Sequence, residues 1–164
     1  MVADVMHIQD QTFLISISSP LELLLACRVK SLLASDLGTG VQRHINTLRS
    51  RGFEPKKICV DPHKSLAPLE TSFPSIEMEI TGAGDHLDKV DIRIRRLKEL
   101  MRAVAAGLPF KLGRDRVKDL VTYAVSRMNL RCTMSLNDTE CPRVRFTDAR
   151  PEYKSELGLS LETM

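Results

Sequence analysis

Three aspartates occupy positions from which carboxylates can do chemistry. Asp4 lies within the apolar stretch 2–8, Asp61 follows the short run 57–60, and Asp91 falls in the first turns of a long helical pattern. A carboxylate inside an apolar strand is costly to bury unless it is paired or binds a metal, and strand ends are where active-site groups gather in open α/β sheets. Together these carboxylates predict a site for Mg²⁺ or Mn²⁺, because hard divalent ions prefer oxygen ligands.

Such a site would suit phosphoryl transfer. Two divalent ions about 4 Å apart activate a water or hydroxyl and stabilise the leaving oxygen. Each aspartate also has a purely structural interpretation. An Asp at a strand end commonly caps a turn, and an Asp in a first helical turn complements the helix dipole. Asp88 is an alternative residue for that helix start, with Asp91 as a bystander.

The long helical pattern over 86–106 has a strongly basic side. Its cations are Lys89, Arg93, Arg95, Arg96, Lys98 and Arg102. Basic side chains beside a metal site suit a phosphate backbone and predict duplex DNA as a partner. The alternative is a solvated helix face held by internal pairs such as Asp91 with Arg95.

The elements that must position these residues follow from periodicity. Residues 2–8, 12–18 and 23–30 form three β-like runs with tight breaks, which predicts an antiparallel meander. A helical pattern between 33 and 51 follows, then a strand at 57–60, a short helix over 63–71 and a strand near the sheet edge at 76–81. This order predicts an α/β fold with a mixed five-stranded sheet, three antiparallel strands first, flanked by helices.

The clearest element is the long helix. Its apolar stripe steps by three and four residues through Leu87, Val90, Ile94, Leu97 and Met101. A second helix is predicted over 114–129. Beyond it, prolines and scattered charge predict an extended, partly ordered tail. The expected organisation is therefore a core over 1–130 and a tail over 131–164.

Composition narrows the class of protein. The chain has 164 residues, enough for one domain with a real core. Apolar residues make up 43% and charged residues 27%, which is globular composition. The longest apolar run covers only 23–27 and the first residues lack a signal-peptide pattern, so we expect an intracellular protein without a membrane partner. Two Tyr, five Phe and no Trp argue against a base-stacking platform.

The cysteines predict no zinc site. Cys27, Cys59, Cys132 and Cys141 form no pair at C-x2-C spacing, and no His pair has the spacing of zinc ligands. Reduced thiols of an intracellular protein are the simpler interpretation.

A set of short motifs, weak one by one, is more specific in its order and spacing. The motifs are Ala3-Asp4-Val-Met with 13–18, Leu48-Arg-Ser-Arg-Gly-Phe53, Ile58-Cys-Val-Asp61, Gly82-Ala-Gly-Asp-His86, Ile94-Arg-Arg-Leu-Lys98, Leu108-Pro109-Phe110, Tyr123-Ala-Val-Ser-Arg-Met-Asn129 and Cys141-Pro142-Arg143 followed by Phe146-Thr147 and Arg150-Pro151-Glu-Tyr153. Through them, residues 4–157 resemble the catalytic core of retroviral-type integrases, most closely those of copia-type retrotransposon polyproteins.

The resemblance implies an RNase H-like fold, a triad of two Asp and one Glu, and two Mg²⁺ or Mn²⁺ ions. The implied reaction is 3′-end processing and strand transfer of donor DNA into target DNA. The first triad position falls on Asp4, the second on Asp61, 57 residues later, and the third on Asp91, 30 residues further on. The resemblance also implies a nuclear location and a homodimer.

The third position departs from the family, which has Glu where this chain has Asp91. Aspartate is one methylene shorter, and a misplacement of about 1 Å can cost on the order of 100-fold in rate. An inactive core is therefore one expectation. Two alternatives stay open: a metal-free module that binds nucleic acid or protein through the basic helix 86–106, and a decayed reading frame of a transposable element.

Overall fold

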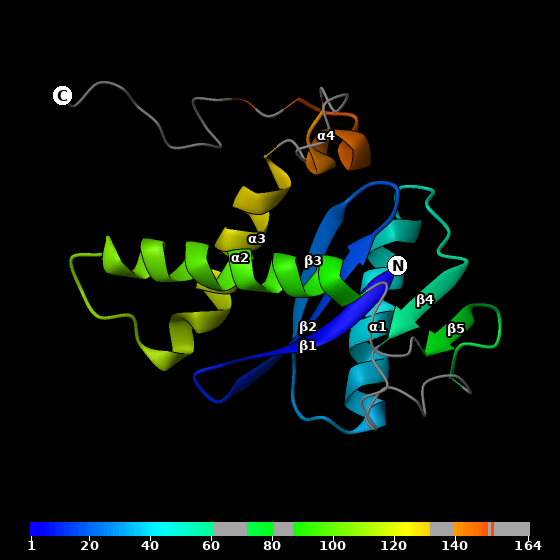
Figure 1. Ribbon diagram of the computed structural model, residues 1–164, viewed down its shortest axis with the longest axis horizontal. Helices are drawn as coiled ribbons and strands as arrows, with labels where there is room; N and C mark the ends of the chain where they lie inside the picture. The colour runs from blue at the N-terminus through cyan, green and yellow to red at the C-terminus, as the bar shows by residue number, and fades with distance from the viewer. Residues whose placement is uncertain (61–71, 81–86, 132–139, 151, 153–164) are drawn as a thin grey trace.

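The computed structural model describes residues 1–60, 72–80, 87–131, 140–150 and 152. Figure 1 shows the elements, which are β1 (Val2–Ile8), β2 (Gln11–Ser18), β3 (Leu23–Val29), α1 (Ala34–Arg49), β4 (Lys57–Val60), β5 (Glu77–Ile80), α2 (Leu87–Ala106), η2 (Arg114–Arg116), α3 (Val117–Asn129) and α4 (Pro142–Thr147). The predicted strands and the three predicted longer helices are confirmed to within two residues, with the helix at 114–129 starting as the 3₁₀ turn η2. The short helix expected over 63–71 lies outside the described residues.

The strands form one five-stranded mixed sheet in the order β3-β2-β1-β4-β5. β1, β2 and β3 are antiparallel neighbours, whereas β4 runs parallel to β1 and β5 parallel to β4. This confirms the predicted α/β class, the antiparallel first three strands and the edge position of the strand near residue 80.

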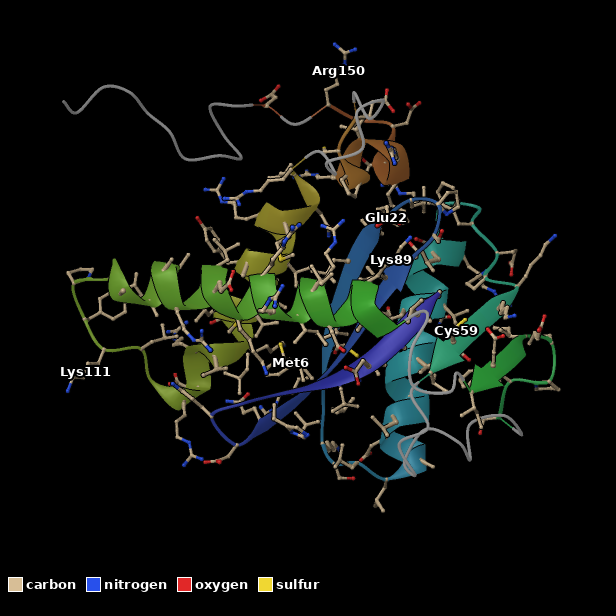
Figure 2. The ribbon with its side chains drawn as sticks, in the orientation of Figure 1. Met6, Glu22, Cys59, Lys89, Lys111 and Arg150 are labelled. Atoms are coloured by element: carbon tan, nitrogen blue, oxygen red, sulfur yellow. The ribbon has the colours of Figure 1, made fainter. Side chains whose placement is uncertain are left out.

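Helices cover both faces of the sheet. The alternation of side chains along β1 divides the core: Ala3 packs in the cluster under α1, while Met6 packs in the cluster under α2 and α3. Figure 2 labels Met6 along β1, below α2 in this view. Val41 and Ile45 anchor α1 on one face. On the other face lie α2 and α3, where Val90, Ile94, Leu97 and Met101 of the predicted apolar stripe are buried.

The helix α1 lies unusually close to the sheet at Gly40. A Cβ added there would lie 3.0 Å from Cδ2 of Leu14 and 3.2 Å from Sγ of Cys27. Glycine costs about 1 kcal/mol of helix propensity relative to Ala, and close packing explains why it is nevertheless suited to this position.

Part of the expected tail is helical. Within the segment 131–164, predicted to be extended, Pro142–Thr147 form the short helix α4. Pro142 stands in its first turn, where a missing N–H costs nothing, and the ring of Phe146 lies 6.0 Å from the ring of Phe53. The prediction is wrong for this stretch because α4 owes its position to a distant contact rather than to a local pattern.

No helix in the described parts of the chain is both long enough and apolar enough to cross a membrane.

Candidate functional site

Asp4, the first predicted carboxylate, lies in the middle of β1. It is half-buried and stands opposite Ile15 of β2. Its Oδ1 accepts a hydrogen bond from the backbone N–H of Val5, with 2.6 Å between nitrogen and oxygen. Since Ala3 packs beneath α1, strand alternation puts Asp4 on the opposite face, the side of the sheet that α2 covers.

The strands β1 and β4 are paired so that the residue before Asp4 lies opposite the residue before Asp61. Val2 pairs with Cys59 and Ala3 pairs with Val60 in the parallel ladder. The N–H of Cys59 also donates to the carbonyl of Met1 at 2.8 Å. Asp4 follows Ala3 in the sequence and Asp61 follows Val60, although Asp61 itself lies outside the described residues.

Asp91 lies on the first turns of α2 with its side chain exposed. The adjacent Val90 is fully buried in the core and fixes this turn against the sheet. Among described residues no ion pair joins Asp91 to Arg95, so the internal pair suggested for this helix does not form in the structure. Nor do three His, Cys, Asp or Glu side chains of the described residues gather into a metal-binding group.

The predicted basic side of α2 is divided by its contacts. Four of its six cations are exposed, namely Lys89, Arg95, Arg96 and Arg102. Arg93 is different, because its guanidinium lies 3.5 Å from a carboxylate oxygen of Glu22 and both side chains are largely covered. Arg93 therefore ties α2 to the segment before β3 and is poorly placed to contact a ligand.

The last cation, the half-buried Lys98, and the exposed Arg102 show how α2 lies along β1. Lys98 and Arg102 line a shallow groove of about 300 Å³ together with His7 and Gln9, at the carboxyl end of β1. The opposite end of α2 begins near the chain's N-terminus in Figure 1. The helix thus runs in the direction of β1, with Asp91 toward the amino end of that strand.

A polar network across β4 and β5 is absent from the predicted site residues. Sγ of Cys59 donates to Oε2 of Glu79 at 3.2 Å, and Nζ of Lys57 lies 3.3 Å from Glu77 and 3.1 Å from Glu79. Burial and the hydrogen bond to Glu79 raise the pKa of the Cys59 thiol. The pairing of Cys59 with Val2 puts this network on the face that holds Asp4, and Figure 2 labels Cys59 on β4.

A signal for this network was present in the sequence. Lys57 and Cys59 alternate with buried Ile58 and Val60, and the strand 76–81 alternates strictly as well. Alternation of this kind puts every second side chain on one face. What the sequence did not show was which strands are neighbours, and hence that these side chains meet.

No protein-family model matches the chain, and no curated protein matches it either.

Proposed function

We propose that this chain is an RNase H-like, integrase-type catalytic core that carries out metal-dependent strand transfer on duplex DNA. The observation that carries the proposal is the β1–β4 register, in which Ala3 pairs with Val60. Asp4 and Asp61 each come directly after these paired residues in the sequence. Neighbouring strands are about 4.8 Å apart, a spacing at which two carboxylates can share one ion.

Asp4, Asp61 and Asp91 would hold the ions. Bound Mg²⁺ or Mn²⁺ supplies activation of a 3′ hydroxyl and stabilisation of the leaving phosphate oxygen. The carboxylate of Asp4 suits this role because it is half-buried and the N–H of Val5 orients one of its oxygens. Asp91 projects from a turn that the buried Val90 holds in place.

The exposed cations of α2 would hold the DNA. Lys89, Arg95 and Arg96 lie on the same helix as Asp91 and are accessible to solvent. Contacts from Lys and Arg to phosphates position a duplex without reading its sequence. Cleavage and joining would then depend on backbone geometry, which fits a protein with few aromatic side chains.

The proposal is tested first by titrating Mn²⁺ into the wild type and into Asp4→Asn and Asp61→Asn. We expect binding in the wild type that each substitution abolishes. Asp115→Asn is the matched control, because it neutralises an exposed carboxylate on η2. Absence of Mn²⁺ binding, or binding that both substitutions leave unchanged, would refute the metal site.

The second test is a strand-transfer assay with Mn²⁺ on the wild type and on Asp91→Glu. A longer side chain restores a reach of about 1 Å, so we expect a gain on the order of 100-fold. If the metal binds but neither protein joins DNA, catalysis is refuted and the scaffold only binds.

The exposed cations of α2 favour a second candidate, a metal-free module that binds nucleic acid through this helix. No ion pair to another described residue occupies Lys89, Arg95, Arg96 or Arg102. Duplex binding by such a module would fall steeply with salt and persist in EDTA. Arg95→Glu combined with Lys98→Glu should abolish it, whereas the exposed Lys111→Glu should not.

A further inference from the structure

The outer edge of β3 is open along half its length. β3 is an edge strand and pairs with β2 alone among the strands of the described sheet. In an antiparallel pair, backbone groups of alternate residues point to the partner strand or away from it. The backbone N–H and C=O of Leu24 point away from β2. The N–H donates to Oδ1 of Asn129 and the carbonyl accepts from Nδ2 of Asn129, both at 2.8 Å. The same alternation directs the N–H and C=O of Ala26 and Arg28 outward.

The side-chain amide of Asn129 therefore pairs with the edge at the beginning of β3 as a neighbouring strand would. Helix α4 contacts β3 as well, and Arg143 and Phe146 lie near the same end of the strand. From Ala26 onward the edge forms instead the floor of a groove of about 600 Å³. Helix α1 supplies one wall of this groove and α3 the other.

The groove is strongly basic. Its lining contains Arg28 on β3, Lys30 just after it, Arg43 on α1 and Lys118 on α3, all of them exposed. The single carboxylate among the lining residues, Asp36, accepts a hydrogen bond from the hydroxyl of Ser31 at 2.6 Å. Cations thus stand on both walls above a strand edge with outward donors and acceptors.

We propose that this groove, the β3-edge groove, binds an extended acidic peptide of a partner protein as an added strand. An added strand supplies both an acceptor and a donor to Ala26 and to Arg28, and its side chains point alternately to the two walls. A wall with Arg43 and a wall with Lys118 favour acidic side chains on both faces of that peptide. Residues 26–30 span about 17 Å at roughly 3.3 Å per residue, which matches a peptide of about five residues.

Two other occupants fit the groove less well. A phosphate backbone offers acceptors but no donors, so it would leave the outward carbonyls of Ala26 and Arg28 without partners. The β3 edge of a second copy would bring the same cations against these ones, and like charges on an edge oppose such pairing. The chemistry of the groove therefore selects a peptide with carboxylates.

The proposal is tested by fluorescence anisotropy with a labelled peptide of alternating Glu and Val, seven residues long, against the whole chain. We expect Arg28→Glu combined with Arg43→Glu to weaken binding at least tenfold. Lys111→Glu is the matched control, since Lys111 is exposed and labelled in Figure 2 on the connection after α2, away from β3. Equal binding by the groove variant and the control would overturn the proposal.

A second arm separates strand addition from charge attraction. Ala26→Pro removes an N–H that points away from β2, and proline is tolerated at such edge positions, so we expect binding to weaken about tenfold with little change in Tm. With the wild type, N-methylation of alternate peptide residues should abolish binding in one of the two alternating sets only. If both methylated peptides bind like the parent, or if single-stranded DNA displaces the peptide and binds more tightly, the peptide site is refuted. Asp4→Asn should bind the peptide normally, which keeps this result independent of the proposed catalytic function.

Discussion

The α1 face of the sheet encloses a polar pair, whereas the opposite face leaves polar side chains, Asp4 among them, half-buried. On the α1 face, Oγ of Ser16 lies 2.7 Å from Nδ1 of His44, and both residues are buried. On the other face, Asp4 is half-buried beside β4 and on the side of α2. The two faces share one sheet and similar apolar surroundings, but one has sealed its polar pair from water.

The difference shows that a polar residue inside an apolar strand is an ambiguous signal. Ser16 and Asp4 both interrupt apolar runs. Ser16 meets His44, 28 residues away, and the pair satisfies one nitrogen of the ring in a water-excluded core. The hydrogen bond makes this burial tolerable, because a buried polar group without a partner is costly. Asp4 keeps access to solvent, which a metal or substrate requires.

The largest expected effect is the loss of activity on replacing Asp4, the accessible polar residue of this comparison. Replacing Asp4 by Asn should reduce Mn²⁺-dependent strand transfer on the order of 1000-fold, about 4 kcal/mol, because bound metal contributes several kcal/mol to such reactions. Thermal unfolding should be almost unchanged. A large loss of Tm with normal Mn²⁺ binding would instead assign Asp4 a structural role.

The next effect is the pH dependence of stability caused by His44. Burial lowers the pKa of His44 from 6.5 to about 4, so below pH 6.5 the unfolded chain takes up a proton that the folded chain does not. The free energy of unfolding should therefore fall by about 3 kcal/mol as pH drops from above 6.5 to 4. Urea unfolding at several pH values measures this loss.

His44→Leu combined with Ser16→Ala removes both partners and should flatten that pH dependence. His7→Gln, at an exposed position on β1, is the control and should leave the dependence as in the wild type. An unchanged slope in the double variant would mean that other groups govern the acid limb.

A smaller effect is expected at the edge of the sheet. Asn129→Ala leaves the outward N–H and C=O of Leu24 without their partners, which should cost about 2 kcal/mol in the free energy of unfolding. Asn129→Asp keeps an acceptor but loses the donor, so its free energy of unfolding should lie between those of the wild type and Asn129→Ala. Hydrogen exchange at the Leu24 amide provides a local measurement. Protection as strong in Asn129→Ala as in the wild type would show that another group covers this edge.

The smallest effect distinguishes two arginines of α2. Arg93→Ala removes the partner of Glu22 and should cost less than about 1 kcal/mol in stability, without altering duplex binding. Arg95→Ala should leave stability unchanged and lower the slope of log affinity against log salt by about one. Salt titrations of duplex binding by both variants make the comparison. An equal loss of slope would contradict the assignment of Arg93 to structure and Arg95 to DNA binding.

Much of the fold was predictable because its signals are local. The stripe from Leu87 to Met101 and the alternation of β2 are set by side chains a few residues apart. The short helix α4 was not predictable, since its six residues lack a stripe and its Phe146 packs on Phe53, 93 positions earlier in the sequence. The role of Gly40 was not predictable either, because the lack of a side chain matters there only through the closeness of Leu14 and Cys27.

The candidate site divides in the same way. The sequence marked Asp4 and the cations of α2, since a carboxylate in a strand and a charged helix face are visible in one dimension. It did not show that Arg93 is paired with Glu22, or that Cys59, on the strand next to β1, meets Glu79 of β5. Those facts depend on which segments are neighbours.

By itself, the sequence determined the element types, the meander of β1 to β3 and the charge of α2, because periodicity and composition act over short distances. Only the tertiary structure decided which polar groups are enclosed and which stay accessible. Asn129 covers Leu24 across 105 residues of sequence, and Arg28, Arg43 and Lys118 meet around one groove. Such meetings require the chain to close long loops, and the packing of two faces on one sheet determines where they occur.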